Sequence, residues 1–126
     1  MMSLTRKIYS SLGEVNSPYV HAVKHNNTLY VSGLTAFGSA AQGEDVIAQA
    51  REIFRQLTVI ATEEGCNLSA LVKVTLYLTQ LESLSALRTL LYQQYGDHLP
   101  ASTLLQFSAL FSADLKIEID AILALD

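Results

Sequence analysis

The eight residues LVKVTLYL, which run from Leu71 to Leu78, decide the fold that we expect for this chain of 126 residues. The even-numbered residues of the stretch are all aliphatic, and Lys73, Thr75 and Tyr77 stand between them. A period of two that includes β-branched residues is typical of a strand with one apolar face. The stretch therefore predicts a strand near the middle of the chain.

A helix is expected before this strand. Apolar residues recur there at intervals of three and four, which places them on one helical face. They are Ile47, Ala50, Phe54, Leu57 and Ala61. Asp45 is suited to be the N-cap of this helix, and Gly65 is expected to end it. The small residues from Gly38 to Gly43 predict a loop ahead of the helix.

A second helix is expected after the strand. Thr79 and Glu82 have the spacing of a capping box, and the apolar stripe that follows them ends near Gly96. The stripe consists of Leu84, Leu87, Leu91 and Tyr95. Two further strands are predicted beyond this helix, from Thr103 to Leu110 and from Leu115 to Leu123. The charged residues of the last strand share its less apolar face.

Two more strands are predicted near the N-terminus, from Val20 to Val23 and from Thr28 to Leu34. The residues between them include Asn26 and Asn27, which tolerate the positive φ of a tight hairpin turn. The resulting order of elements predicts one α+β domain over residues 1–126, a mixed sheet with both helices packed on one face. The uncovered face is expected to close against copies of the chain in a cyclic oligomer.

The composition agrees with a single domain that forms an oligomer. Half of the residues are hydrophobic and only 16% are charged, so some apolar surface is expected in a subunit interface. The longest apolar runs are far shorter than the ~20 residues that span a bilayer, and no secretion signal is apparent, so we expect a cytoplasmic protein. Cys66 is the only cysteine, which excludes a disulfide within the chain.

No common catalytic signature is found in the sequence. There is no Gly-rich phosphate loop, no nucleophile elbow and no pair of histidines at metal spacing, so neither a metal nor a cofactor is expected. His21, His25 and His98 are far apart, and a hydrogen-bonded or surface histidine is the more common case for each. The net charge of −4 disfavours nucleic acid as a partner, because that affinity comes largely from Lys and Arg.

Four short segments together resemble the RidA/YjgF family, whose members include trimeric enzymes that hydrolyse reactive imines. They are SPYVHAV at Ser17–Val23, LYVSG at Leu29–Gly33, VKVTLYLT at Val72–Thr79 and IEIDA at Ile117–Ala121. Their order and spacing match the family from about Ser17 to Ala121. RNA cleavage has been attributed to some relatives, and the acidic charge of this chain disfavours it here.

The resemblance implies a site as well as a fold. Three chains would assemble with their sheets inward, and small-molecule clefts would form between neighbouring subunits. Tyr19 would pack against the ligand, Ser32 and Gly33 would line the floor, and Glu118 would meet a water molecule or the imine. No cofactor is implied.

One position departs from the family. An arginine normally follows the Pro-Ala pair at Pro100 and Ala101, and this chain has Ser102 there. The arginine would hold a substrate carboxylate by two charged hydrogen bonds, and its loss is expected to cost about 2 to 5 kcal/mol of binding. One hypothesis is that Arg88 supplies a relocated guanidinium. The alternative is a solvated Arg88, or one paired with Glu82 or Asp97.

The other site residues also have structural interpretations. Tyr19 could anchor the start of the hairpin, and Ser32 with Gly33 could mark a strand bulge. Glu118 could pair with Lys116 or Lys73, although a carboxylate beside an apolar wall often has a raised pKa and serves as acid or base.

Two functions therefore remain open from the sequence. The first is hydrolysis of an imine or enamine in an intersubunit cleft, with Glu118 activating water and Ser102 or Arg88 contacting the polar end of the substrate. The second is a non-catalytic trimer that binds a small metabolite or a protein. Release of ammonia from fresh 2-iminobutyrate distinguishes them.

Overall fold

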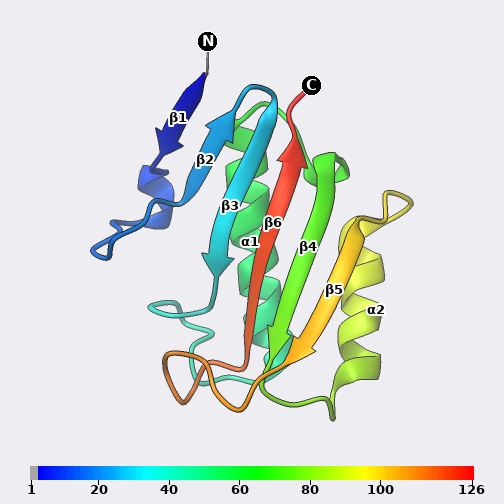
Figure 1. Ribbon diagram of the computed structural model, residues 1–126. Coiled ribbons are helices and arrows are strands. Elements are labelled where there is room, and N and C mark those ends of the chain that lie inside the picture. The colour runs from blue at the N-terminus through cyan, green and yellow to red at the C-terminus, as the bar shows by residue number, and fades with distance from the viewer. Residues whose placement is uncertain (1–2) are drawn as a thin grey trace.

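The strand predicted from the alternating stretch lies inside a six-stranded mixed sheet, in a computed structural model that describes residues 3–126. Both helices cover one face of this sheet (Figure 1). The strands are β1 (Leu4–Lys7), β2 (Ala22–His25), β3 (Thr28–Leu34), β4 (Leu71–Leu78), β5 (Ala101–Gln106) and β6 (Ile117–Ala124). The helices are α1 (Val46–Glu63) and α2 (Leu84–Tyr95), with short 3₁₀ turns at Ser10–Leu12 and Leu68–Ala70.

The strands lie in the order β1-β2-β3-β6-β4-β5, so the last strand of the chain is near the middle of the sheet. Only β4 and β5 are parallel, and α2 makes the crossover between them. All other neighbours are antiparallel. The α+β architecture expected from the sequence is therefore confirmed.

The core lies between the sheet and the two helices. Its largest fully buried side chains come from both helices, from β3, β4 and β6, and from the residues just before β6. They are Phe54, Leu29, Ile53, Leu57, Ile60, Leu76, Leu78, Leu87, Leu115, Ile117, Ile119 and Leu123. On β6 the buried residues alternate with partly exposed ones, which leaves Glu118 and Asp120 on the open face.

One buried polar residue ties the first turn of α1 to the chain before β6. The amide nitrogen of Gln49 donates to the carbonyl oxygens of Glu44, at 3.1 Å, and of Asp114, at 2.8 Å. Its amide oxygen accepts a hydrogen bond from the backbone N–H of Lys116 at 2.8 Å. Gln49 is fully buried. It therefore fixes where β6 begins and thus where the side chains of β6 lie.

The local signals at turns and helix ends predicted the structure well. Asp45 is the N-cap of α1 and accepts a hydrogen bond from the backbone N–H of Ala48 at 2.8 Å. Gly65 follows the helix with a φ of 82°, a conformation that favours glycine. Asn26 has a φ of 55° in the two-residue turn between β2 and β3. The hairpin prediction is therefore confirmed.

Other boundaries differ from the expectation. The capping box at Thr79 is wrong, because its backbone N–H bonds the carbonyl of Lys116 and extends the β4–β6 pairing, while α2 begins after Ser83. The strand expected up to Leu110 ends at Gln106, because β4 ends at Leu78 and offers no further partner. The predicted bounds of β3 and β4 are confirmed. Those of β2, the start of β5 and both ends of β6 shift by one or two residues, and β1 was not predicted.

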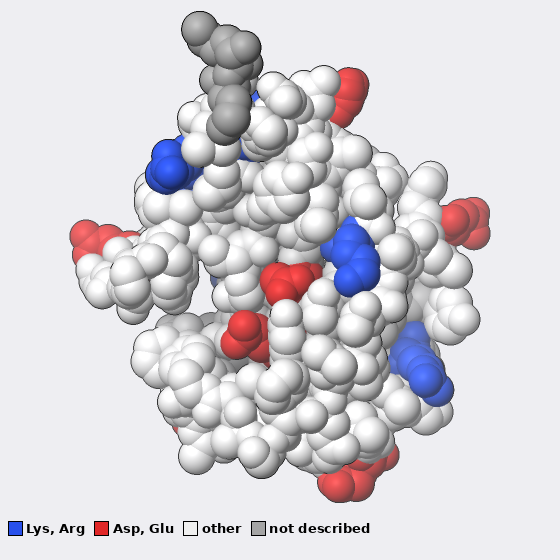
Figure 2. Space-filling view, viewed as in Figure 1, with Lys and Arg blue, Asp and Glu red and all other residues white. Residues whose placement is uncertain are grey.

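The face of the sheet that the helices leave open carries charge at its centre. Figure 2 shows acidic side chains at the middle of this face and a basic side chain beside them. On this face β6 carries Glu118 and Asp120, and β4 carries Lys73, all three partly exposed. No helix within residues 3–126 is long and apolar enough to cross a membrane.

Candidate functional site

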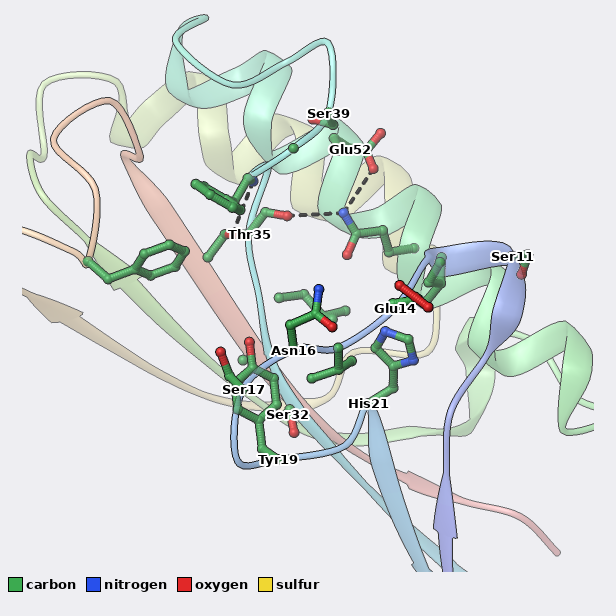
Figure 3. A pocket seen from close by; sticks show the side chains of 18 of the residues that line it. Ser11, Glu14, Asn16, Ser17, Tyr19, His21, Ser32, Thr35, Ser39 and Glu52 are labelled. Atoms are coloured by element: carbon green, nitrogen blue, oxygen red, sulfur yellow. Dashed lines mark hydrogen bonds between the residues drawn. The ribbon is translucent and has the colours of Figure 1, made fainter.

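A cavity of about 460 Å³ lies at one end of β3. Its walls come from the loop before β2, the end of β3 with the loop that follows it, α1, and the loop before β6, which contributes Phe111 (Figure 3). The first three of these segments are held together because α1 packs behind the sheet while the loop before β2 folds over the end of β3. The cavity therefore collects polar side chains that are far apart in the sequence.

Three of the residues expected in a site line this cavity, namely Tyr19, Ser32 and Gly33. The Tyr19 side chain is 58% exposed, so it does not anchor the hairpin by burial. The hydroxyl of Ser32 donates to the carbonyl oxygen of Val20 at 2.6 Å, which holds the loop against β3. Ser32 thus has a structural bond in addition to its place in the cavity wall.

Gly33 lies in an irregular part of the ladder between β3 and β6, where the register shifts between Val31 and Leu34. This irregularity agrees with a strand bulge, the structural interpretation considered for Ser32 and Gly33. The space that a side chain would take at Gly33 is filled by Glu118, because a Cβ built there would lie 2.8 Å from the Glu118 Cδ and closer still to Oε2. Glu118 therefore adjoins the cavity through Gly33.

Glu118 has the electrostatic character of an acid–base group. Burial raises the pKa of its carboxyl, and the charge of Asp120 on the same face raises that pKa further. Asp120 itself accepts a hydrogen bond from the hydroxyl of Tyr77 at 2.7 Å, which raises the pKa of Tyr77 to about 12. Within residues 3–126 the ion pairs are Lys7 with Glu64 and Arg55 with Glu52, so Glu118 pairs with neither lysine considered above.

His21 also reaches the cavity. Its Nδ1 accepts a hydrogen bond from the backbone N–H of Tyr9 at 2.9 Å, and its ring stacks on that of Tyr9. Burial lowers the pKa of His21. The ring is therefore a neutral imidazole whose proton is on Nε2, a hydrogen-bond donor in the wall of the cavity.

The helix side of the cavity contains a cation that the sequence analysis did not identify. Arg55 donates from Nε to Oε1 of Glu52 at 2.9 Å and from Nη2 to Oε2 at 2.8 Å. Gln56 donates to the same carboxylate at 2.8 Å and to the carbonyl oxygen of Thr35 at 3.0 Å (Figure 3). No local pattern distinguishes Arg55 from other exposed helix residues, so only the fold places it at this wall.

The remaining two residues proposed from the sequence lie elsewhere. Ser102 is exposed on the edge strand β5 and pairs in register with Val74, whose side chain faces the helices, so Ser102 lies on the helix side of the sheet. Glu118 pairs with Tyr77 and lies on the opposite, open face. Arg88 is exposed on α2 and does not line the cavity within the chain. A single chain therefore brings neither residue to Glu118.

Across the part of the chain that the structure describes, no group of three or more His, Cys, Asp and Glu side chains could hold a metal ion. The chemistry available at the cavity is that of a raised-pKa carboxyl, a neutral imidazole and backbone polar groups.

The family model described as Endoribonuclease L-PSP matches residues 11–125. A 2-iminobutanoate/2-iminopropanoate deaminase of Capra hircus is 30% identical, over 97% of this chain and 92% of its own. Among solved structures, a protein of unknown function from Pseudomonas aeruginosa has a TM-score of 0.91 at 25% identity, covering 100% of this chain and 95% of that chain. RidA from an Antarctic Psychrobacter has a TM-score of 0.79 at 28% identity, covering 88% and 91%. Since the family match extends over nearly the whole fold that holds this cavity, the chain belongs to the RidA/YjgF family.

Proposed function

We propose that this protein hydrolyses imines or enamines of a small metabolite, with Glu118 as the acid–base group. The observation that carries the proposal is the position of the Glu118 carboxyl, which packs on Gly33 at the edge of the cavity, where burial raises its pKa. A carboxyl with a raised pKa can take a proton from water and return it to a leaving nitrogen. The deaminase name of the Capra hircus relative supports the same reaction class.

The residues of the cavity suit the successive steps of such a hydrolysis. Glu118 accepts a proton from water as the water oxygen attacks the imine carbon, and it then protonates the nitrogen that leaves. Tyr19 supplies an exposed ring against which a planar imine can stack, while the backbone at Ser32 and Gly33 forms the floor. An enamine is first protonated on carbon and then follows the same path.

The proposed assembly is a trimer in which the open sheet faces meet. The exposed apolar residues on and beside this face support burial against another subunit, among them Tyr30, Leu105 and Phe107. In such a trimer the β5 edge, with Ser102, would meet the cleft of a neighbouring subunit. A serine there cannot bind a carboxylate by two charged hydrogen bonds, so activity on plain 2-imino acids should be reduced.

The test is the release of ammonia from imines prepared in the assay, using 2-iminobutyrate and imines of other shapes. We expect turnover of at least one imine, and a loss of about 10³-fold or more in Glu118→Gln, in the range of general acid–base catalysis. Glu44→Gln is the matched control, because Glu44 is exposed and its carboxylate makes no hydrogen bond in the described structure. No turnover of any imine would overturn the proposal, as would full activity of Glu118→Gln.

The second candidate is a non-catalytic module that binds a small metabolite, favoured by Ser102 at the position of the family arginine. Saturable binding of a 2-oxo acid without turnover of any imine would support it. Arg88→Ala tests whether a cation from α2 takes part in that binding. Unchanged affinity of Arg88→Ala would rule out the relocated cation, and a clear loss would show that Arg88 of one subunit reaches the cleft of another.

A further inference from the structure

The charges around the cavity indicate what kind of substrate it accepts. A substrate carboxylate needs a cation with free N–H groups, and Arg55 is the one lysine or arginine among the lining residues that the structure describes. Its Nε and Nη2 are both bound to Glu52, at 2.9 and 2.8 Å. Because the pair is bidentate, the two charges cancel and the fork that would grip a carboxylate is already occupied.

His21 does not supply the missing charge. Its Nδ1 accepts the Tyr9 N–H at 2.9 Å, so a doubly protonated ring would break that bond and bring two N–H groups together. Burial also lowers its pKa. His21 therefore remains a neutral donor in the working pH range of most enzymes.

The carboxylates of the site outnumber its cations. Glu14 lines the cavity and forms no ion pair within residues 3–126. Glu118 stands behind Gly33, with Asp120 beside it on β6. An anionic substrate would thus meet like charges on two sides, whereas a cationic iminium would be attracted.

The rest of the wall is aromatic. Phe37 and Phe111 meet edge to face with ring centroids 5.2 Å apart, and they are 58% and 68% exposed. Both line the cavity, as does Tyr19. Exposed aromatic rings of this kind bind an apolar group and also favour a cation placed over their faces.

We infer that the substrate is an imine without a carboxylate, which carries an apolar or aromatic group and reacts as the iminium ion. This inference rests on the proposed function. Water adds through oxygen to the iminium carbon while Glu118 takes its proton. The carbon–nitrogen bond of the resulting carbinolamine then breaks, so that an iminium and water give an aldehyde or ketone and ammonium. The reaction that supplies such a substrate is the two-electron oxidation of an amine.

Two imines that differ only in the carboxylate provide the test. One is formed in the assay from 2-phenylethylamine by a flavin amine oxidase, and the other from phenylalanine by a flavin amino-acid oxidase. We expect kcat/KM for ammonia release to be at least about 10-fold higher for the imine from 2-phenylethylamine, because the carboxylates of the site repel the carboxylate of the imine from phenylalanine. Equal or faster turnover of the imine with the carboxylate would overturn the inference and leave the proposed function standing. No turnover of any of the three imines, 2-iminobutyrate included, would overturn both.

A charge variant separates electrostatics from shape. Glu14→Gln removes one negative charge from the lining. It should reduce the ratio of kcat/KM between the imine without a carboxylate and the imine with one by about 1.5- to 5-fold, the range of one exposed charge interaction. Glu44→Gln removes a charge outside the lining and should leave the preference unchanged. The electrostatic argument would be contradicted if Glu14→Gln left this ratio unchanged. It would also be contradicted if Glu44→Gln changed the ratio as much as Glu14→Gln does.

Discussion

The contact between Gly33 and Glu118 gives the sharpest test of where the chemistry takes place. In Gly33→Ala the new Cβ would lie 2.8 Å from the Glu118 Cδ, whereas an ordinary contact begins at 3.4 Å, so the carboxyl carbon must retreat by about 0.6 Å. The oxygen lies nearer to the new methyl group and must move farther. A misplacement of about 1 Å in a catalytic group can cost about 100-fold in rate, or about 2.7 kcal/mol of transition-state stabilisation.

Stability should change little in the same variant. Gly33 is not among the residues with a left-handed φ, so alanine meets no backbone strain. Replacing glycine by alanine within a strand gains about 0.5–1 kcal/mol, which offsets the displacement of a flexible side-chain end. We therefore expect the free energy of unfolding to stay within about 1 kcal/mol of the wild type while kcat/KM falls about 100-fold.

The assay is imine-dependent ammonia release, measured together with thermal unfolding for Gly33→Ala, Glu118→Ala and the double variant. If the methyl group acts through the carboxylate, it has no further effect on the residual rate of Glu118→Ala. Wild-type kcat/KM in Gly33→Ala would refute the reasoning. An equal loss in both backgrounds would show that the methyl group acts on something other than Glu118.

Four further predictions concern pH dependence and stability. Asp120→Asn removes the charge that helps raise the Glu118 pKa, so the acid limb of a kcat/KM–pH profile should move to lower pH. The raised pKa of Glu118 also means that the wild type loses stability as pH rises from the ordinary value of 4.5 through the pKa of the folded state. Glu118→Gln should therefore be more stable than the wild type at pH 7, and this difference should vanish in unfolding curves measured below pH 4.5. Gln49→Leu leaves three backbone groups without their hydrogen bonds and should lower the free energy of unfolding in urea by about 2–4 kcal/mol. An unchanged free energy of unfolding would contradict this prediction and would show that water replaces the amide. Tyr9→Phe removes the 2.8 Å bond from the hydroxyl to Glu64 and should cost about 1–2 kcal/mol, whereas an unchanged midpoint would show that this bond is not net stabilising.

The elements that the sequence predicted are those whose signals are local. The strand at residues 71–78, the N-cap at Asp45 and the turn at Asn26 each depend on neighbours within a few positions, and all three were confirmed. Within that strand Val72 departs from the predicted apolar face and is 49% exposed, because the ladder with β6 is irregular between Leu71 and Lys73. The capping box failed for the opposite reason. Thr79 bonds a backbone carbonyl from a segment almost 40 residues away, and this tertiary pairing outweighs the local preference.

The site was predictable only in part. The resemblance identified Tyr19, Ser32 and Gly33, which do share a cavity, and Glu118, which adjoins it. Glu14 and Arg55 carry no motif, and they enter the cavity because the loop before β2 and α1 converge in space. The functional assignment of these residues stays a prediction until the variants above are measured.

The position of β6 between β3 and β4 also constrains how the protein is made. The hairpin half of the sheet and the β4–β5 half share no hydrogen-bonded ladder except through residues 117–124. On the ribosome, these residues must leave the exit tunnel before the halves can join, and until then the edges of β3 and β4 are open to aggregation. The two halves of the sheet are therefore expected to join only after the strand that carries Glu118 has left the tunnel.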